Sequence, residues 1–126
     1  MPALPWVQLH EADPDREYVV MASRLPLRAH WFVPGFLRDT MRIRRQLAQA
    51  DGLVGYALNA QLARKTFWTF SVWRDRTSLD AFAREEPHRS IMGRLRPRMG
   101  ESRFELFTLQ GSEIPTTWDQ MMAPVA

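Results

Sequence analysis

The sequence predicts one α+β domain, built in the order strand, helix, strand, strand, helix, strand. Apolar side chains recur at every second residue in four segments and at every third or fourth residue in two others. The chain has 126 residues, the length of one ordinary domain. Its 45% hydrophobic and 25% charged residues match an average globular protein, so we expect a packed core.

The first strand is expected after an N-terminal arm. Residues 1–16 contain three prolines and show no period, which is typical of an extended arm. The following EYVVMASRLPL alternates, with Val19 and Met21 on one face and Val20 on the other. Pro26 cannot donate a ladder hydrogen bond, so the strand is expected to end there or continue as an edge.

The first helix is predicted in HWFVPGFLRDTMRIRRQLAQADG. Apolar residues recur at spacings of three and four from Phe36 through Ile43 to Ala50, which is the pattern of an amphipathic helix. Pro34 suits the first turn, where a missing N–H has no cost, and Gly52 suits the helix end.

Two strands joined by a short turn are predicted next. Bulky residues alternate with small ones in LVGYALNAQLA, whereas TFWTFSVW is largely apolar on both faces. A strand that is apolar on both faces belongs in the centre of a sheet that is covered on both sides. The polar break between the two strands is short and consists of Arg64 and Lys65, so we expect the strands to form a hairpin.

The second helix is expected in SLDAFAREE, with Thr77 or Ser78 as its N-cap and Leu79 facing inward. Pro87 interrupts this helix, and HRSIMGRLRPRM is expected to resume it as a second short piece. The last strand is predicted in SRFELFTLQ, which alternates again. The residues after Gly111 are expected to be irregular.

This order of elements is that of the ferredoxin-like βαββαβ fold, a four-stranded antiparallel sheet with two helices on one face. We assign this domain to residues 17–110. The N-terminal arm then comprises residues 1–16 and a C-terminal tail comprises residues 111–126.

One consequence concerns the second face of the sheet. Two helices can cover only one face, yet the third strand is apolar on both. A second sheet from an identical subunit is the simplest cover, so we expect a homodimer. The alternative is that the N-terminal arm and the tail around Trp118 fold over this face.

Composition excludes several kinds of site. The chain has no cysteine, which excludes disulfides and thiolate metal sites and suits a reducing compartment. No apolar run approaches the roughly 18 to 20 residues that cross a membrane, and the N-terminus lacks a signal-peptide pattern. We therefore expect a cytoplasmic protein with no membrane partner.

The charge pattern argues against nucleic acid. The formal net charge is +3, and the basic residues are almost all arginine. Acidic residues are interspersed along the chain, and no zinc-finger spacing or aromatic RNP-type motif is present. We therefore expect no nucleic-acid partner.

A family resemblance is carried by FSVWRDRTSLDAFAREEPHRSIM and by the upstream DGLVGYALN. The first segment has an apolar strand ending in Trp73, a charged turn, a helix with Leu79 and Phe82, and His88 a few residues later. These features resemble the antibiotic biosynthesis monooxygenase superfamily over roughly residues 17–110.

The resemblance implies a dimeric α+β barrel with a mostly apolar pocket between sheet and helices. Members of the superfamily include cofactor-independent oxygenases of aromatic polyketides, haem-degrading oxygenases and proteins without demonstrated activity, so fold alone does not select the function. The haem-degrading pattern of Asn, Trp and His is replaced here by Ser23, Phe82 and Met92. Haem bound through His88 is kept as an alternative.

Three residues are candidates for catalysis. His88 offers a neutral imidazole that can accept a proton near pH 7. Arg24 can neutralise an enolate or carboxylate, and Asn59 can hydrogen-bond a phenol or quinol oxygen. Each also has a structural interpretation, with His88 as a capping or surface residue and Asn59 as a solvated residue near the hairpin.

Six further residues are candidates for contacting an aromatic ligand. Aromatic walls suit planar, hydrophobic molecules, although core packing explains the same side chains. The candidates are Tyr56, Trp68, Phe70, Phe104, His30 and Trp31. The three histidines are far apart in sequence, so no metal site is expected.

We therefore expect a small monooxygenase-like protein that binds a planar aromatic, quinol-like or polyketide-like substrate and needs no cofactor. In such a reaction the deprotonated substrate itself transfers an electron to oxygen, so the protein supplies a base, an oxyanion partner and a dry cavity. A haem-binding protein of the same fold and a non-catalytic ligand-binding dimer are the alternatives.

Overall fold

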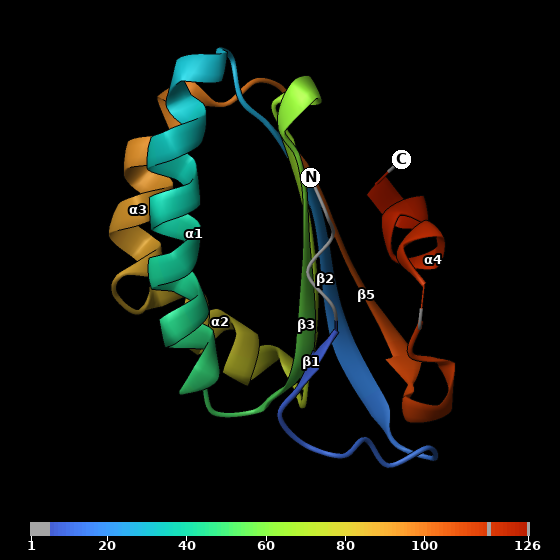
Figure 1. The fold of residues 1–126 in the computed structure, drawn as a ribbon. Helices are drawn as coiled ribbons and strands as arrows, with labels where there is room; N and C mark the ends of the chain where they lie inside the picture. The colour runs from blue at the N-terminus through green and yellow to red at the C-terminus, as the bar shows by residue number, and fades with distance from the viewer. Residues whose placement is uncertain (1–5, 116, 126) are drawn as a thin grey trace.

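The computed structural model describes residues 6–115 and 117–125, which form a five-stranded antiparallel sheet with helices on both faces (Figure 1). The strands are β1 Val7–Gln8, β2 Glu17–Pro26, β3 Leu53–Gln61, β4 Thr66–Trp73 and β5 Arg103–Gln110. The helices are α1 Val33–Ala48, α2 Arg76–Arg84, α3 His88–Leu95 and α4 Trp118–Met122. Short 3₁₀ turns are η1 His30–Phe32, η2 Leu62–Arg64, η3 Arg96–Arg98, η4 Gly111–Glu113 and η5 Ala123–Val125.

The strand order is β1-β3-β4-β2-β5, and its four long strands confirm the ferredoxin-like prediction. The predicted number of strands was too low by one, because Val7 and Gln8 of the N-terminal arm pair with Tyr56 and Gly55 of β3. The first five residues of the predicted arm lie outside the described residues. Among the described residues, no helix is both long enough and apolar enough to cross a membrane.

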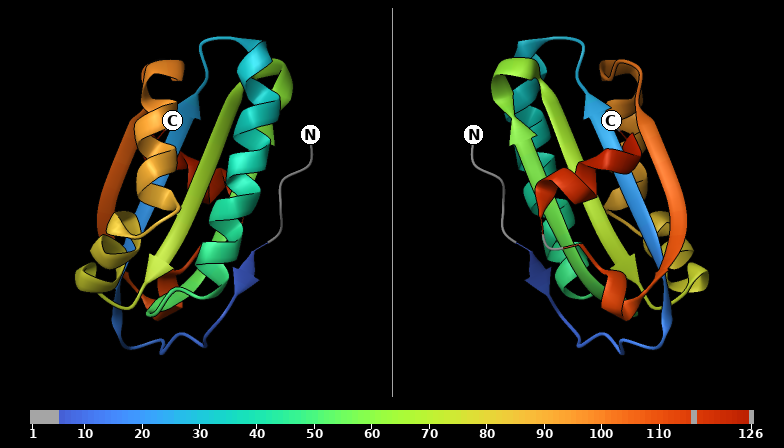
Figure 2. Two further views of the ribbon diagram at one scale, coloured as in Figure 1. Left: turned by 90° about the vertical axis from the view of Figure 1, so that its left-hand side faces the viewer. Right: turned by 90° about the vertical axis from the view of Figure 1, so that its right-hand side faces the viewer.

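The helices divide between the two faces of the sheet (Figure 2). Helices α1, α2 and α3 lie over one face, which we call the helix face, and α2 and α3 are the two pieces predicted for the second helix. The tail was expected to be irregular but forms α4 and η5. These two elements lie over the opposite face, which we call the tail face.

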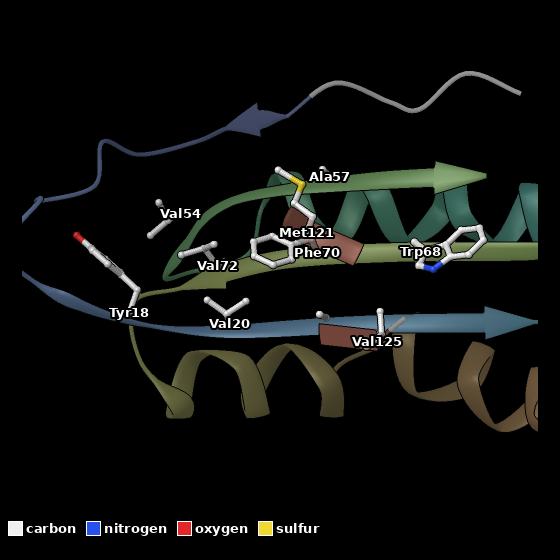
Figure 3. Packing of buried hydrophobic residues seen from close by; sticks show 10 residues of the cluster. Tyr18, Val20, Val54, Ala57, Trp68, Phe70, Val72, Met121 and Val125 are labelled. Atoms are coloured by element: carbon white, nitrogen blue, oxygen red, sulfur yellow. The ribbon is translucent and has the colours of Figure 1, made fainter. Parts of the chain in front are cut away.

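The chain itself covers the tail face. This is the arrangement that was given above as the alternative to a homodimer. Met121 and Val125 are only 3% and 1% exposed and pack against a cluster of sheet residues (Figure 3). On the same face the Trp6 ring lies so close to Gly55 that a β-carbon there would collide with it. The homodimer was expected because this face was thought to be open, so the structure removes that reason for it.

Two local expectations are corrected. The N-cap of α2 is Asp75, whose carboxylate accepts a hydrogen bond from the Ser78 backbone N–H at 2.8 Å, rather than Thr77 or Ser78. Gly52 adopts a φ of 82°, but α1 has already ended at Ala48. Gly52 therefore makes the turn into β3 instead of terminating the helix.

Candidate functional site

The core beneath the helices consists of two clusters at opposite ends of the sheet. One cluster contains Leu25, Leu27, Val33, Phe36, Phe67, Ile91, Leu95 and Met99. The other contains Leu47, Leu53, Tyr56, Trp73, Leu79 and Phe82. Strand β4 runs from Phe67 in the first cluster to Trp73 in the second. Thr69 and Ser71 of β4 therefore lie where the buried core is interrupted.

Hydroxyl and partly buried side chains occupy this interruption. We call this set the hydroxyl strip, and it consists of Met21, Ser23, Leu58, Thr69 and Ser71. All of them except Ser23 are partly exposed, and the strand register places Ser23 and Leu58 beside Thr69, and Met21 beside Ser71. Because β2 and β4 are interior strands, the partly exposed side chains lie at the centre of the helix face and not at an edge of the sheet.

The hydroxyl groups in the strip are hydrogen-bonded but retain bonding capacity. Ser23 Oγ and Thr69 Oγ1 share a hydrogen bond, and whichever oxygen accepts it keeps its own O–H for another partner. Ser71 Oγ accepts a hydrogen bond from the Trp73 indole at 2.9 Å and donates a long one to the Met21 carbonyl at 3.5 Å. The O–H that stays free in the Ser23–Thr69 pair can therefore donate to an oxygen atom of a ligand placed over the strip.

The edge strand β5 borders the strip with apolar side chains. Phe104 lies beside Ser23 and Leu106 beside Met21 in the strand register. Phe104 is 49% exposed and Leu106 is 37% exposed, because the helix layer does not cover this edge. The strip is therefore flanked on one side by apolar surface that solvent can reach.

His88 begins α3 on the same side of the sheet. Its Nδ1 lies 3.2 Å from the Ala83 carbonyl oxygen, which can only accept, so Nδ1 carries the proton and Nε2 is the acceptor. Burial lowers the pKa of His88 below its ordinary value of 6.5, and the bond to Ala83 opposes that shift. The imidazole is therefore neutral near pH 7.

An aromatic path connects His88 with the strip. The His88 ring lies 5.0 Å from the Phe82 ring, measured between centroids, and the Phe82 ring lies 5.2 Å from the Trp73 ring. Trp73 in turn donates its indole hydrogen bond to Ser71. His88 thus belongs to the helix face, separated from the hydroxyls by these two aromatic side chains.

Four candidate residues lie on the tail face instead. Arg24 and Asn59 both pair with Trp68 in the strand register, and the Asn59 amide contacts the Met122 sulfur at 3.8 Å. Trp68 and Phe70 are 6% and 1% exposed within the core cluster that the tail completes. The sheet separates all of these residues from His88. The structure therefore does not bring the three expected catalytic residues together.

The remaining aromatic candidates are divided between the helix face and one end of the molecule. Tyr56 packs in the helix-face core, where its hydroxyl accepts a long hydrogen bond from Arg44 at 3.5 Å. The His30 ring donates to the Ala63 carbonyl at 3.3 Å, and Trp31 is 79% exposed. Of the six, only Tyr56 and Phe104 share the helix face with His88.

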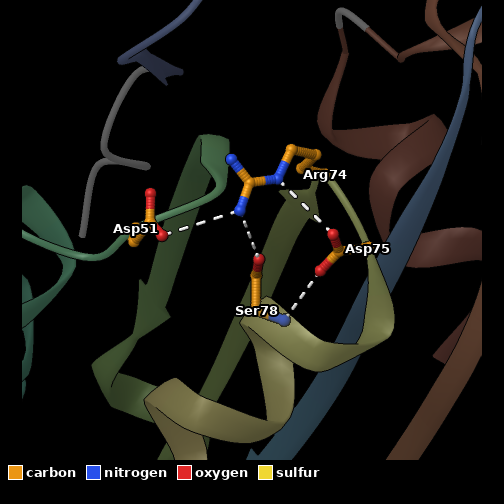
Figure 4. Close-up of polar contacts among 4 residues, drawn as sticks. All are labelled: Asp51, Arg74, Asp75 and Ser78. Carbon is orange, nitrogen blue, oxygen red and sulfur yellow. Dashed lines mark hydrogen bonds and ion pairs between the residues drawn. The ribbon is translucent and has the colours of Figure 1, made fainter.

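The charged turn that carries the family resemblance has a structural role (Figure 4). The Arg74 guanidinium lies 3.4 Å from Asp75 and 3.6 Å from Asp51, and its backbone N–H donates to the Gly52 carbonyl at 2.7 Å. The backbone hydrogen bond from Ser78 is the largest cause that holds the pKa of Asp75 below its usual value. A shallow hollow of about 180 Å³ lies here. The turn joins α2 to the hairpin strands.

Sequence comparison gave no result, since no protein-family model and no curated protein matches the chain. Solved structures do match. SnoaB from Streptomyces nogalater, a cofactor-independent oxygenase, aligns with 75% of this chain and 95% of its own at 18% identity and a TM-score of 0.61. A candidate antibiotic biosynthesis monooxygenase from Deinococcus radiodurans aligns over 71% and 89% at 13% identity and a TM-score of 0.61. A conserved Methanosarcina mazei protein aligns over 71% and 90% at 15% identity and 0.64.

The chain has the fold of the antibiotic biosynthesis monooxygenase-like proteins. At these identities the likeness concerns the fold alone, and it confirms the ferredoxin-like α+β fold that the sequence resemblance implied. Within this monooxygenase-like fold, the described residues contain no group of three or more His, Asp or Glu side chains placed to hold a metal ion.

Two features of this chain could not be predicted from the sequence. The first is the set of strip hydroxyls, whose signal was a pair of polar residues, Thr69 and Ser71, inside an otherwise apolar central strand. The second is an ion pair between helices α1 and α3, in which Arg94 contacts Asp39 at 2.6 Å. Asp39 has a 2% exposed side chain, and no short motif links the two residues, which are 55 positions apart.

Proposed function

We propose that this chain is a cofactor-independent monooxygenase-like protein that binds a planar aromatic substrate over the hydroxyl strip. The observation that carries the proposal is the interruption of the helix-face core by partly exposed polar side chains on interior strands. A core position that only had to be filled would hold apolar side chains. Space and hydrogen-bond donors at the centre of the domain are what a small-molecule site requires.

The surroundings of the strip favour a flat, mostly apolar ligand. At one end the Phe36 and Phe67 rings stack with centroids 4.1 Å apart, and at the other end stand Trp73 and Phe82. Aromatic rings accept other rings edge to face or offset-stacked. The few hydroxyls between these ends match a ligand with one or two oxygen atoms, such as a phenol, a quinol or an anthrone.

The chemistry proposed needs only the substrate and molecular oxygen. An anthrone in its enol form loses a proton and passes an electron to O₂, after which the two species combine at the reacting carbon. One oxygen atom ends in the new carbonyl group, and the other leaves as water with the two hydrogens of the former CH₂. The protein stabilises the anion and excludes bulk water.

Within this proposal the residues take specific roles. His88 is the proposed base for a substrate that extends from the strip past Trp73 and Phe82, because its imidazole is neutral and Nε2 can accept a proton. The hydroxyl that stays free in the Ser23–Thr69 pair donates to the substrate oxygen as negative charge develops. This pair replaces Arg24 and Asn59, which the sheet separates from His88.

The test compares two threonines on the same face of the sheet. Thr69→Val removes a strip hydroxyl with little change in shape, and Thr108→Val makes the same change on β5, where Thr108 is exposed. Anthrone binding is followed by tryptophan fluorescence and oxygen uptake with an electrode. We expect Thr69→Val to weaken binding about three- to tenfold and Thr108→Val to leave it unchanged. Equal behaviour of the two variants would refute the site.

The same measurements separate the alternatives. Anthrone binding without oxygen uptake would favour a non-catalytic ligand-binding protein. Oxygen uptake that survives in His88→Gln would remove His88 as the base while keeping the strip. A saturable Soret shift with haemin that disappears in His88→Gln would favour the haem-binding alternative.

A further inference from the structure

Three loops distant in sequence meet at one end of the molecule, at the top of Figure 1. They are residues 27–32, 62–66 and 96–102, which contain η1, η2 and η3. Backbone hydrogen bonds fix them together, since the Leu27 N–H donates to the Lys65 carbonyl at 2.8 Å and the Arg28 N–H to the Arg98 carbonyl at 2.9 Å. The loops therefore present one surface, which we call the basic end.

The basic end concentrates positive charge. Its cations are Arg28, Arg64, Lys65, Arg96 and Arg98, whereas Glu101 is the only acidic residue in the three segments. Within the part of the chain that the structure describes, none of these five cations forms an ion pair. A second group of arginines lies on α1, where Asp39 is the one acidic residue, and the variants below compare the two groups. The positive electrostatic potential of the basic end attracts an anionic partner.

Each of the three loops also exposes an apolar residue near its cations. Trp31 is 79% exposed, more than any other large apolar side chain among the described residues. Ala63 and Pro97 are exposed as well, beside Arg64 and between Arg96 and Arg98. Indole rings at a protein surface are typical of contacts that place one edge in an apolar layer and another in water.

The backbone at Lys65 supports a role for its charge. Lys65 adopts a left-handed conformation, with a φ of 54°, at the turn between β3 and β4. Glycine or asparagine adopts this conformation more easily than lysine. The turn geometry therefore does not itself account for a lysine at this position.

We propose that the basic end docks on an anionic lipid surface, with Trp31 entering the headgroup layer and the positive charge of the basic end attracting lipid phosphates. Lysine and arginine near such a surface each add attraction, and indole rings prefer the membrane interface. We expected no membrane partner because the sequence has no apolar run long enough to span a membrane. A surface that docks on a membrane needs no such run. Docking would bring the protein to where poorly soluble aromatic molecules accumulate, but the proposal does not depend on oxygenase chemistry.

Lipid fits this surface better than single-stranded nucleic acid does. Proteins that bind single strands stack successive bases on several aromatic rings. Here Trp31 is the exposed ring, while the neighbouring Phe32 ring is covered by the Arg98 guanidinium at 5.3 Å. Apolar tips on three loops, each beside cations, match a flat apolar layer beneath phosphates.

The test is co-sedimentation of the full chain with vesicles. One set contains equal parts of phosphatidylglycerol and phosphatidylcholine, and the other contains phosphatidylcholine alone. We expect binding to the anionic vesicles only, and we expect it to weaken as salt rises from about 0.05 M to about 0.5 M. Equal binding to both sets, or binding to neither, would overturn the proposal.

Variants with matched charge locate the surface. Arg64→Gln with Lys65→Gly removes two positive charges from the basic end, and we expect vesicle binding to fall about 30-fold. Arg42→Gln with Arg45→Gln removes the same charge from exposed positions on α1 and should change binding far less. Trp31→Ala should weaken binding severalfold without changing the thermal midpoint, because Trp31 is exposed. Equal losses in the two double variants would contradict docking through this end.

A thymidylate oligonucleotide serves as the competing ligand. If it binds the chain, depends on Arg64 and Lys65, and the anionic vesicles do not bind, the surface is a nucleic-acid site and the lipid proposal is wrong. These outcomes are independent of anthrone binding and oxygen uptake, which test the hydroxyl strip.

Discussion

The Trp73 indole N–H donates a hydrogen bond to the Ser71 hydroxyl oxygen at 2.9 Å, two residues away on the same face of β4. Trp73 is 1% exposed, so this bond satisfies a donor that water cannot reach. Ser71 therefore links two strands, since it holds the indole of β4 in the helix-face core and its hydroxyl donates to the Met21 carbonyl of β2 at 3.5 Å.

We expect Ser71→Ala to lower the free energy of unfolding by about 1 to 2 kcal/mol, because it leaves a buried indole N–H without a partner. Ser112→Ala makes the same chemical change at an exposed position and should have little effect. Denaturant unfolding of the two variants checks this. A similar midpoint for both would show that the indole finds another acceptor.

The ion pair between α1 and α3 yields a second prediction. Arg94→Gln leaves the Asp39 carboxylate, with 2% side-chain exposure, without its charged partner, and Arg94 itself is 41% exposed. We expect a loss of about 2 kcal/mol, because water can partly replace the exposed arginine. Adding Asp39→Asn to Arg94→Gln should recover part of that loss in denaturant unfolding. No recovery in the double variant would mean that the carboxylate is stabilised by other groups.

The arrangement of the elements could be predicted from sequence because each element has its own local period. The alternation in TFWTFSVW and the three-to-four spacing around Phe36 and Ile43 each require a buried face. The cover of the tail face could not be predicted. Met121 and Val125 lie in a segment with no period, so the same apolar residues would also suit a contact with a second subunit.

The candidate site was predicted less well, because the face on which a side chain lies depends on the register between neighbouring strands. A register shift between Leu53 and Gly55 places Val54 on the tail face, although it alternates with Tyr56 and Leu58, which lie on the helix face. The alternating period alone predicts that Val54, Tyr56 and Leu58 lie on one face. The sequence also suggested Tyr56 and Trp68 as contacts of one ligand, although Trp68 lies on the opposite face of the sheet. The basic end is a similar case, because its cations come from three separate loops.

His88 should make stability depend on pH. Burial lowers its pKa in the folded state below the ordinary value of 6.5, so the unfolded chain binds more protons between the two values. The contribution to stability is complete above about pH 6.5 and is lost as pH falls through the window below it. Thermal midpoints of the wild type and His88→Gln, measured from pH 7.5 to pH 5, should therefore converge on the acid side. His10→Gln, at an exposed position, should retain the wild-type slope.

The tail should contribute to stability as part of the core. Met121 is 3% exposed, and truncating such a side chain to alanine costs about 2 to 5 kcal/mol. Met41 is 49% exposed on α1, so Met41→Ala is the matched control and should change stability by less than about 0.5 kcal/mol. Comparable midpoints for Met121→Ala and Met41→Ala in chemical unfolding would mean that the tail does not stay packed on the sheet.

A homodimer stays a prediction, and the surface that the structure leaves for it is the edge strand β5. An edge strand with exposed Phe104 and Leu106 can pair with another strand. If two copies of β5 pair antiparallel about Phe104, the two phenyl rings meet and each Arg103 lies opposite Glu105 of the second copy, which is a favourable charge order. We expect analytical ultracentrifugation to give a dimer for the wild type and a monomer for Phe104→Lys. Thr108→Lys adds the same charge to the same strand outside this contact and should remain dimeric. A dimer that persists in Phe104→Lys would place the contact on another surface.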